Sequence, residues 1–198
     1  MPPKGYADWA WVQHMVTSAS PGTGRVAVVL PQGALFRQGA ERRIREHMLK
    51  ADLVEAVIGL APNLFYGTGL AASVMILRRK KVDDRKGKVL FINGETLFRR
   101  GRNQNTLEPE QASTLLAAYE AFTAEPGLSA VATLDDIGAN GYNLNIPLYV
   151  EPLRSGDEVT LERALADLEA AHRAARETRV ALDVELAKWG LGPVEEDL

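Results

Sequence analysis

Apolar positions in the first hundred residues follow two different spacings, which predict helices and strands in alternation. Short, nearly continuous apolar runs are typical of buried strands, whereas apolar residues three and four apart are typical of amphipathic helices. On this basis we expect strands at 25–30, 52–58 and 70–77, and helices at 6–18 and 40–50. The valine-rich first strand is expected to be buried on both faces.

The order of these elements predicts the topology of the sheet. A helix separates the first two strands, so they should run in parallel sense. The loop 59–69 contains no helix, so the strand at 70–77 should return antiparallel beside the second strand. A further apolar run at 88–92 predicts one more strand, at the edge of the sheet. The pattern indicates an α/β sheet that contains a reversed strand.

The last part of the chain has a heptad repeat between Thr160 and Trp189. Leu165 and Leu186 stand on its apolar seam, but His172 and Arg179 occupy seam positions as well. Polar residues on the seam weaken a self-sufficient coiled coil and favour a role in specifying register or partner. We therefore expect a long helix that either docks on a partner or packs back on its own domain.

Composition narrows the class of protein. The 198 residues, of which 46% are hydrophobic, suffice for one globular domain and an appendage. A formal net charge of -3 gives no overall basic field, so any contact with DNA must come from local clusters. The sequence shows no secretory signal pattern and no apolar run near the ~20 residues of a membrane helix. It indicates a soluble, cytoplasmic protein with no membrane partner.

The chain contains no complete catalytic constellation. There are no cysteines, which excludes disulfides and thiolate metal sites. His14, His47 and His172 lie on predicted helices without metal-ligand spacing, so no metal site is expected. The glycine turns 22–24 and 67–69 are not phosphate loops, because neither follows a strand and opens a helix.

Two clusters are candidates for ligand contacts. Phe65 and Tyr66 precede a glycine turn at the mouth of the strand 70–77, and loops at strand ends often carry ligand chemistry. The alternative is that these aromatics close an edge of the core. Arg99, Arg100 and Arg102 either contact phosphates or form an ordinary solvated loop.

Four blocks along the chain carry a family resemblance. In collinear order they are YADWAWVQHM (6–15), GRVAVVLPQGALFR (24–37), AVIGLAPNLFYGTG (56–69) and NGYNLNIP (140–147). Together they resemble the modification subunit of type I restriction-modification systems, a family of N6-adenine DNA methyltransferases that use S-adenosylmethionine.

The resemblance implies a fold and a division of the chain. The fold is the C-terminal half of a class I S-adenosylmethionine-dependent methyltransferase, a Rossmann-like α/β sheet ending in an antiparallel strand, plus a C-terminal helical arm. Residues 1–95 would form the C-terminal part of the methyltransferase domain, and residues 96–156 a connecting helix and loops. Residues 157–190 would form the partner-docking helix.

Two motifs of the family do not occur in this chain. Its acidic, glycine-rich cofactor loop and its Asn/Asp-Pro-Pro-Phe/Tyr motif lie upstream of the first block, and Pro2-Pro3 has no Asn or Asp before it. The chain therefore resembles an excised fragment or a truncated reading frame. S-adenosylmethionine is expected in the intact enzyme, but neither cofactor binding nor catalysis is expected of this chain alone.

The resemblance also implies site residues. Phe65 would wall the target-base pocket, with Tyr66 as the fallback, and Pro31 and Gln32 would line the same cleft. In such systems the implied partners are DNA, a specificity subunit and a restriction subunit. The arginines at 99, 100 and 102 would contact the DNA backbone, and the helix positions Leu165, His172, Arg179 and Leu186 would dock a partner or mediate self-association.

Two alternatives stay open at this point. A non-catalytic binding module would keep the helical arm to dock a specificity subunit without methylating DNA. An unrelated nucleotide-binding α/β protein is the weaker alternative, because the chain has no phosphate loop.

Overall fold

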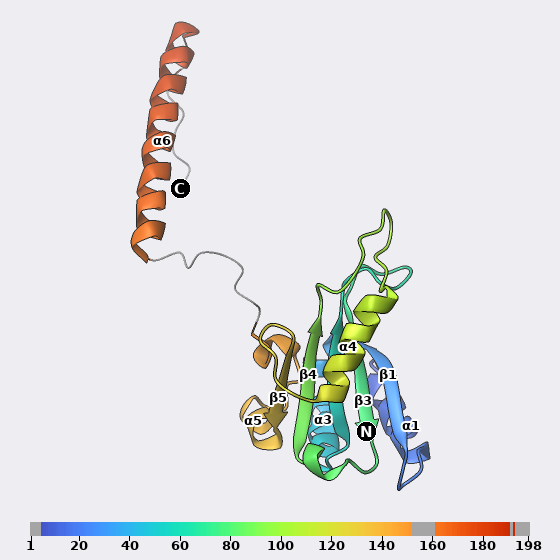
Figure 1. Cartoon of the computed structure of the whole chain (residues 1–198). Coiled ribbons are helices and arrows are strands. Elements are labelled where there is room, and N and C mark those ends of the chain that lie inside the picture. The colour runs from blue at the N-terminus through green and yellow to red at the C-terminus, as the bar shows by residue number, and fades with distance from the viewer. Residues whose placement is uncertain (1–4, 152–160, 191, 193–198) are drawn as a thin grey trace. The chain divides into compact units, whose positions relative to one another are not determined.

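The computed structural model describes residues 5–151, 161–190 and 192. The chain divides into two compact units, Met1–Leu153 and Arg154–Leu198. The first is an α/β unit and the second contains one long helix (Figure 1). The helices and strands of the first unit are α1 (Asp8–Ser18), β1 (Arg25–Pro31), α2 (Gly33–Phe36), α3 (Ala40–Lys50), β2 (Val54–Leu60), β3 (Ala72–Arg78), η1 (Asp83–Arg85), β4 (Lys88–Gly94), α4 (Pro109–Ala121), β5 (Ser129–Thr133), α5 (Leu134–Ala139) and η2 (Ile146–Leu148).

The five strands form one sheet in the order β1-β3-β2-β4-β5. β3 is antiparallel to both β1 and β2, so β1 and β2 run in the same sense, as the sequence predicted. The reversed strand β3 thus lies between them, inside the sheet. β4 is parallel to β2, and β5 is antiparallel to β4.

Two expectations about the strands are wrong. The strand at 88–92 is not at an edge, because the short β5 pairs with the far side of β4. The first strand is not buried on both faces: in the part of the chain that the structure describes, β1 pairs only with β3, and Val29 is 50% exposed. α4 does not cover this strand, because its core contacts are with β2 and β4.

Helices cover the two faces of the sheet unequally (Figure 1). On one face, α1, α2 and α3 pack with α5 and η2 into the larger core. α1 contributes Trp9, Val12 and Val16 to this core, whereas Trp11 on the same helix is 64% exposed. On the other face, α4 alone packs over β2 and β4 through Leu115, Ala118 and Tyr119. This arrangement leaves the opposite edge of the sheet, at β1, open on the α4 side.

Arg45 of α3 joins three segments and has no solvent-exposed surface. Its Nε donates to the carbonyl oxygen of Tyr142 at 2.6 Å, and its Nη1 donates to the carbonyl oxygens of Ala34 and Arg37 at 3.2 and 3.1 Å. Burial lowers the pKa of Arg45 to about 10, so the side chain stays protonated at neutral pH. The charge is thus solvated by main-chain carbonyls, and the segment 140–147 is fixed against α3.

A second buried charge fastens α4 to the sheet. Glu55 on β2 is fully buried; its Oε1 receives hydrogen bonds from Arg85 Nη1 at 2.8 Å and from the Tyr119 hydroxyl at 3.0 Å. The Arg85 guanidinium also lies 4.5 Å from the ring centroid of Phe122. Burial is the main cause of the raised pKa of Tyr119. Together these contacts fix the angle at which α4 crosses the strands.

The segment 96–156, which the sequence assigned to a connecting helix and loops, contributes one strand to the same sheet and two helices that pack on it. α4, β5 and α5 follow residue 95, and β5 hydrogen-bonds along β4 from Lys88 to Ile92. The first compact unit extends past residue 95, to Leu153.

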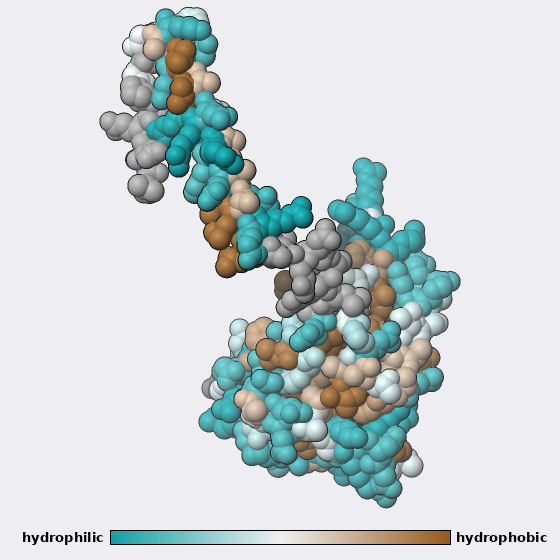
Figure 2. Space-filling view, turned by 60° about the vertical axis from the view of Figure 1, so that its left-hand side comes forward, coloured by the Kyte–Doolittle hydropathy of each residue, from teal (hydrophilic) through white to brown (hydrophobic). Residues whose placement is uncertain are grey.

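The second unit contains α6, Leu161–Lys188, where the heptad pattern predicted a helix. Within the described residues α6 buries none of its side chains, and Leu165 and Leu168 are 50% and 52% exposed. Figure 2 shows apolar patches between polar side chains along this helix. No helix among the described residues combines the length and the hydropathy needed to cross a membrane.

Candidate functional site

The aromatic loop, residues 61–71, connects β2 to the reversed strand β3. Tyr66 is 97% exposed and Phe65 is 38% exposed, and neither belongs to a core cluster. Gly67 has φ +80°, a conformation that side chains disfavour, and it turns the chain directly after the two aromatics. The Thr68 hydroxyl accepts from the Leu70 backbone N–H at 3.1 Å and closes the turn. The loop therefore presents its aromatic rings outward.

The arginine hairpin, residues 99–106, lies beside this loop. Arg99 and Thr106 form a two-hydrogen-bond bridge, with N···O distances of 2.8 and 3.0 Å. Arg99 Nε also donates to Glu108 Oε1 at 2.6 Å, and this bond holds the pKa of the Glu108 carboxyl below its ordinary value. Arg100 and Arg102 are exposed and have no ion-pair partner within the described ranges. Arg99 is thus engaged in the hairpin, whereas the side chains of the other two arginines are exposed.

Hydrogen bonds tie the aromatic loop to the arginine hairpin. They use main-chain and amide groups on both sides, so each loop satisfies polar atoms of the other. The bonds run from Asn105 N to Asn63 O (2.8 Å), from Asn63 Nδ2 to Asn103 O (3.2 Å), from Gln104 Nε2 to Leu64 O (2.5 Å) and from Asn105 Nδ2 to Pro62 O (2.9 Å). The two clusters that the sequence considered separately therefore form one braced surface.

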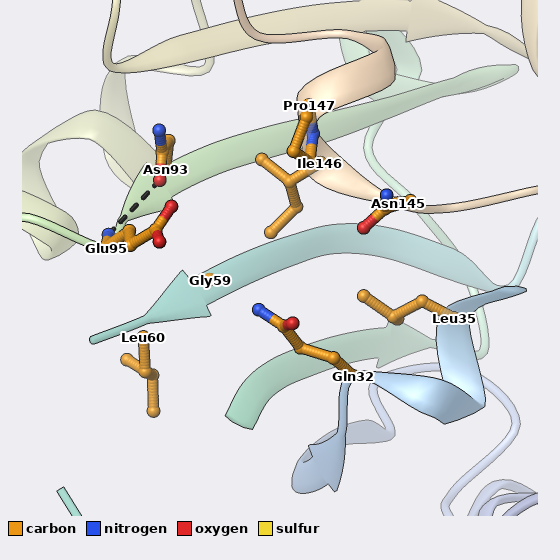
Figure 3. A pocket seen from close by; sticks show the side chains of 9 residues that line it. All are labelled: Gln32, Leu35, Gly59, Leu60, Asn93, Glu95, Asn145, Ile146 and Pro147. Atoms are coloured by element: carbon orange, nitrogen blue, oxygen red, sulfur yellow. Dashed lines mark hydrogen bonds between the residues drawn. The ribbon is translucent and has the colours of Figure 1, made fainter. Parts of the chain in front are cut away.

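A pocket of about 230 Å³ lies at the edge of the sheet where β1, β2 and β4 end (Figure 3). Because these three strands run in the same sense, their carboxyl ends share this edge, the usual place for ligands in open α/β sheets. The pocket is lined by Gln32, Leu35, Gly59, Leu60, Asn93, Glu95, Asn145, Ile146 and Pro147.

Two glycines set the shape of this pocket. A Cβ on Gly59 would lie 2.7 Å from Ile146 Cδ1, and a Cβ on Gly94 would lie 2.5 Å from the carbonyl oxygen of Gly59. Both distances are well below van der Waals contact, so neither position admits a side chain unless its neighbours move. η2 can therefore approach β2 directly, which brings Asn145 over the carboxyl ends of the strands.

The structure places the predicted site residues in two neighbouring regions. Gln32 lines the pocket, while Pro31 is exposed at the end of β1 and is not among the lining residues. Phe65 and Tyr66 lie on the aromatic loop, which starts directly after the pocket residue Leu60. Among the described residues, no cluster of His, Asp or Glu side chains fits a metal ion.

Sequence reasoning missed the amides of this region. Asn93 and Asn145 line the pocket, and Gln104 and Asn105 brace the aromatic loop. The sequence does contain a signal for two of these amides. Asn93 directly follows the apolar run 89–92, and Asn145 alternates with Leu144 and Ile146 in the block NGYNLNIP, as a polar residue next to apolar ones.

One known protein family matches most of this chain. Residues 1–158 match the model of the family described as N-6 DNA Methylase. The chain belongs to this family. The resemblance seen in the four sequence blocks is thereby confirmed, and so is the α/β methyltransferase fold class.

The relatives are methylase subunits of type I restriction enzymes. The MjaVII methylase subunit of Methanocaldococcus jannaschii is 39% identical over 179 residues, which are 89% of this chain and 30% of that protein. The MjaVIII methylase subunit of the same organism is 36% identical over 174 residues, with 86% and 30% covered. The solved methyltransferase subunit of the type I restriction-modification system from Streptococcus thermophilus superposes with a TM-score of 0.72 at 35% identity, over 76% of this chain and 31% of that one. The chain thus spans less than a third of the length of these relatives.

Proposed function

We propose that this family member is the target-base side of an adenine-N6 DNA methyltransferase subunit in a type I restriction-modification system. The observation that carries the proposal is the braced surface: an aromatic loop with exposed rings, tied to a hairpin whose Arg100 and Arg102 have no ion-pair partner among the described residues. An enzyme that modifies a base inside a duplex must extrude that base and hold it, usually by stacking on an aromatic ring. It must also hold the DNA backbone through cationic contacts.

Each part of the braced surface has a role in this proposal. Phe65 stacks on the extruded adenine, with Tyr66 as the fallback. Gln32 lines the neighbouring pocket, and Pro31 ends β1 outside its lining. Arg100 and Arg102 contact phosphates on either side of the extruded nucleotide. Arg99, whose guanidinium is engaged with Glu108, keeps the hairpin in position and contributes less to DNA affinity.

S-adenosylmethionine would supply the methyl group in the intact enzyme, but the described residues do not fit it. The acidic, glycine-rich turn of the family lies upstream of the block 6–15, and no such turn occurs in the sequence of this chain. The chain also has no Asn-Pro-Pro-Phe motif to orient the adenine amine. On these grounds we expect the chain alone neither to bind the cofactor nor to transfer methyl groups.

The second unit supports a role in assembly. α6 carries a seam that includes Leu165, His172 and Leu186, and it buries no side chain within the described residues. In the proposed system this seam docks a specificity subunit, which reads the DNA sequence, and a restriction subunit is the third partner. Self-association through the seam is the competing outcome for the isolated chain.

The proposal is tested with a chimera in which this chain replaces the matching segment of the MjaVII methylase subunit. We expect the chimera, combined with its specificity subunit, to transfer labelled methyl groups to adenine N6 in DNA. The isolated chain should show no saturable micromolar binding of S-adenosylmethionine in calorimetric titration and no methyl transfer. Saturable cofactor binding by the isolated chain, or a folded and assembled chimera without activity, contradicts the proposal.

A second candidate is a non-catalytic module that docks a specificity subunit. It is favoured by the exposed seam of α6 together with the missing cofactor loop. The chimera separates the two candidates, since a docking module would assemble with the specificity subunit and leave adenine unmethylated.

A further inference from the structure

The charged residues of α6 fall into three blocks along the helix. The segment 161–169 carries three acidic residues and one arginine, and the segment 181–188 carries two acidic residues and one lysine. The middle segment 170–180 carries three arginines, one glutamate and one histidine. With histidine counted as neutral, the formal charges of the three blocks are -2, +2 and -1. The helix is therefore basic at its centre and acidic towards both ends.

The heptad register places this basic centre on the apolar seam. With Leu165 at position a and Leu168 at position d, His172 and Arg179 also fall at a, and Arg176 falls at the e position beside the seam. Arg176 is exposed and forms no ion pair within the described part of the chain. The seam thus offers leucines near its two ends and cations in its middle.

A second copy of this helix is a poor partner for such a seam. In a parallel pair in register, Arg179 of one helix faces Arg179 of the other. In an antiparallel pair that overlaps over the whole of Leu161–Lys188, the segment 172–179 faces 170–177. In both arrangements the basic centre meets itself, and like charges brought together at an interface disfavour that pairing. The charge order therefore disfavours self-association through the seam.

DNA is a poor partner as well. The acidic blocks on both sides of the centre repel phosphates, and the leucines of the seam are half exposed, with Leu165 at 50% and Leu182 at 46%. An exposed apolar stripe along a helix is typically covered by another protein surface. The partner indicated by both observations is a protein helix with an apolar seam of its own.

From this pattern we propose that α6 docks a helix whose seam is acidic at its centre and basic towards its ends. Central carboxylates of that helix pair with Arg176 and Arg179, and its apolar residues cover Leu165 and Leu186. Displacement of the partner by one heptad takes its carboxylates away from these arginines, so the charges also set the register of docking. The inference deepens the proposed function, on which it rests for the role of α6 in assembly.

The test is a titration of the full chain with two synthetic helical peptides of 28 residues, the length of α6. Both have leucine at positions a and d and equal numbers of Glu and Lys. The acidic-centre peptide carries Glu in its middle heptads and Lys in its outer ones, and the basic-centre peptide has the reverse order. We expect saturable binding of the acidic-centre peptide, binding of the basic-centre peptide that is at least about tenfold weaker, and no dimer of the full chain in sedimentation velocity.

Charge reversals on the seam provide the matched variants. Arg176→Glu and Arg179→Glu should each weaken binding of the acidic-centre peptide about threefold to tenfold and strengthen binding of the basic-centre peptide. Arg163→Glu makes the same change of charge at an f position, on the outer face of the helix, and should change neither affinity. Far-UV circular dichroism shows whether each variant keeps its helix.

Equal affinities for the two peptides, no saturable binding of the acidic-centre peptide, or equal effects of Arg163→Glu and Arg176→Glu overturn the inference. Dimerisation of the full chain through α6, or tighter binding of a short DNA duplex than of the acidic-centre peptide, overturns it too. The titration uses no specificity subunit, so its failure is distinct from that of the proposed function. A chimera that assembles although the peptides bind equally rejects only the charge pattern. A chain that prefers the acidic-centre peptide in a chimera that does not assemble rejects only the proposed function.

Discussion

The side-chain amide of Asn105 donates to the backbone carbonyl of Pro62 at 2.9 Å, across 43 positions of sequence. Asn105→Ala leaves this carbonyl without its donor and should cost about 1 kcal/mol, a fall in Tm of about 2–4 °C for a chain of this size. Amide hydrogen exchange in residues 64–69 should accelerate. Asn103→Ala is the matched control, because Asn103 contributes only its backbone carbonyl to the brace. Equal exchange in the two variants would show that the side chain of Asn105 does not hold the loop.

Phe65→Ala should impair methylation by the chimera through loss of base stacking, which is worth about 1–3 kcal/mol. The fluorescence of 2-aminopurine at the target position reports extrusion of the base and should fall in the same variant, with cofactor affinity unchanged. Tyr66→Ala is made in parallel. A wild-type methylation rate in Phe65→Ala rejects its role, and a larger loss in Tyr66→Ala assigns the stacking role to Tyr66.

Arg45→Met should lower the free energy of unfolding by about 2–4 kcal/mol, because three buried carbonyls lose a charged donor. The change is measured by chemical denaturation of the full chain. Arg43→Met on the same helix is the control, since Arg43 is exposed. A loss of less than about 0.5 kcal/mol would mean that the segment 140–147 is held by its apolar contacts alone.

The contribution of Glu108 to stability should depend on pH. Arg99 holds the folded-state pKa of this carboxyl below its ordinary value of 4.5. A lowered pKa means that the stabilisation is present above the ordinary value and is lost as the pH falls through the lowered one. Thermal unfolding of Glu108→Gln and the wild type should therefore differ at about pH 7 and converge near about pH 3. Glu110→Gln, on the first turn of α4, serves as control; a gap of constant size across this range contradicts the assignment.

Removal of the residues after Gly156 should leave the α/β unit folded and abolish assembly with the specificity subunit of the chimera. The expectation follows from the division of the chain into two compact units and from the exposed seam of α6. Leu165→Ala with Leu186→Ala should weaken assembly in the full-length chimera, whereas Glu177→Ala should not. Size-exclusion chromatography with the specificity subunit measures this. Assembly of the truncated protein rejects the docking role.

Period and order of elements were sufficient to predict β1 to β4, the helices α1, α3 and α6, and the reversed direction of β3. They were insufficient where a feature depends on a neighbour distant in sequence. The exposure of Val29 depends on which strands α4 covers, and the short β5 is recognised only by its pairing with β4. Single polar residues such as Arg45 and Glu55 were missed for the same reason, because their burial is compensated by groups brought together only by the fold.

The candidate site, too, was predictable from the sequence only in part. The aromatic loop and the arginines were recognisable as clusters of one residue type. Their connection was not, because it consists of amide-to-backbone bonds between segments 40 or more positions apart. Gln32 was placed by family resemblance, and its pocket partner Asn145 by the close approach of η2 to Gly59.

The position of β1 at the margin of the sheet has a consequence for how the sheet can grow. In the described residues this strand pairs only with β3, while the main core, from Trp9 and Val12 to Phe91, lies on its inner side. A polypeptide joined at this margin would extend the main-chain ladder without repacking that core. The free edge of β1 is therefore a place where a further strand can be added to the sheet while this unit keeps its own interior.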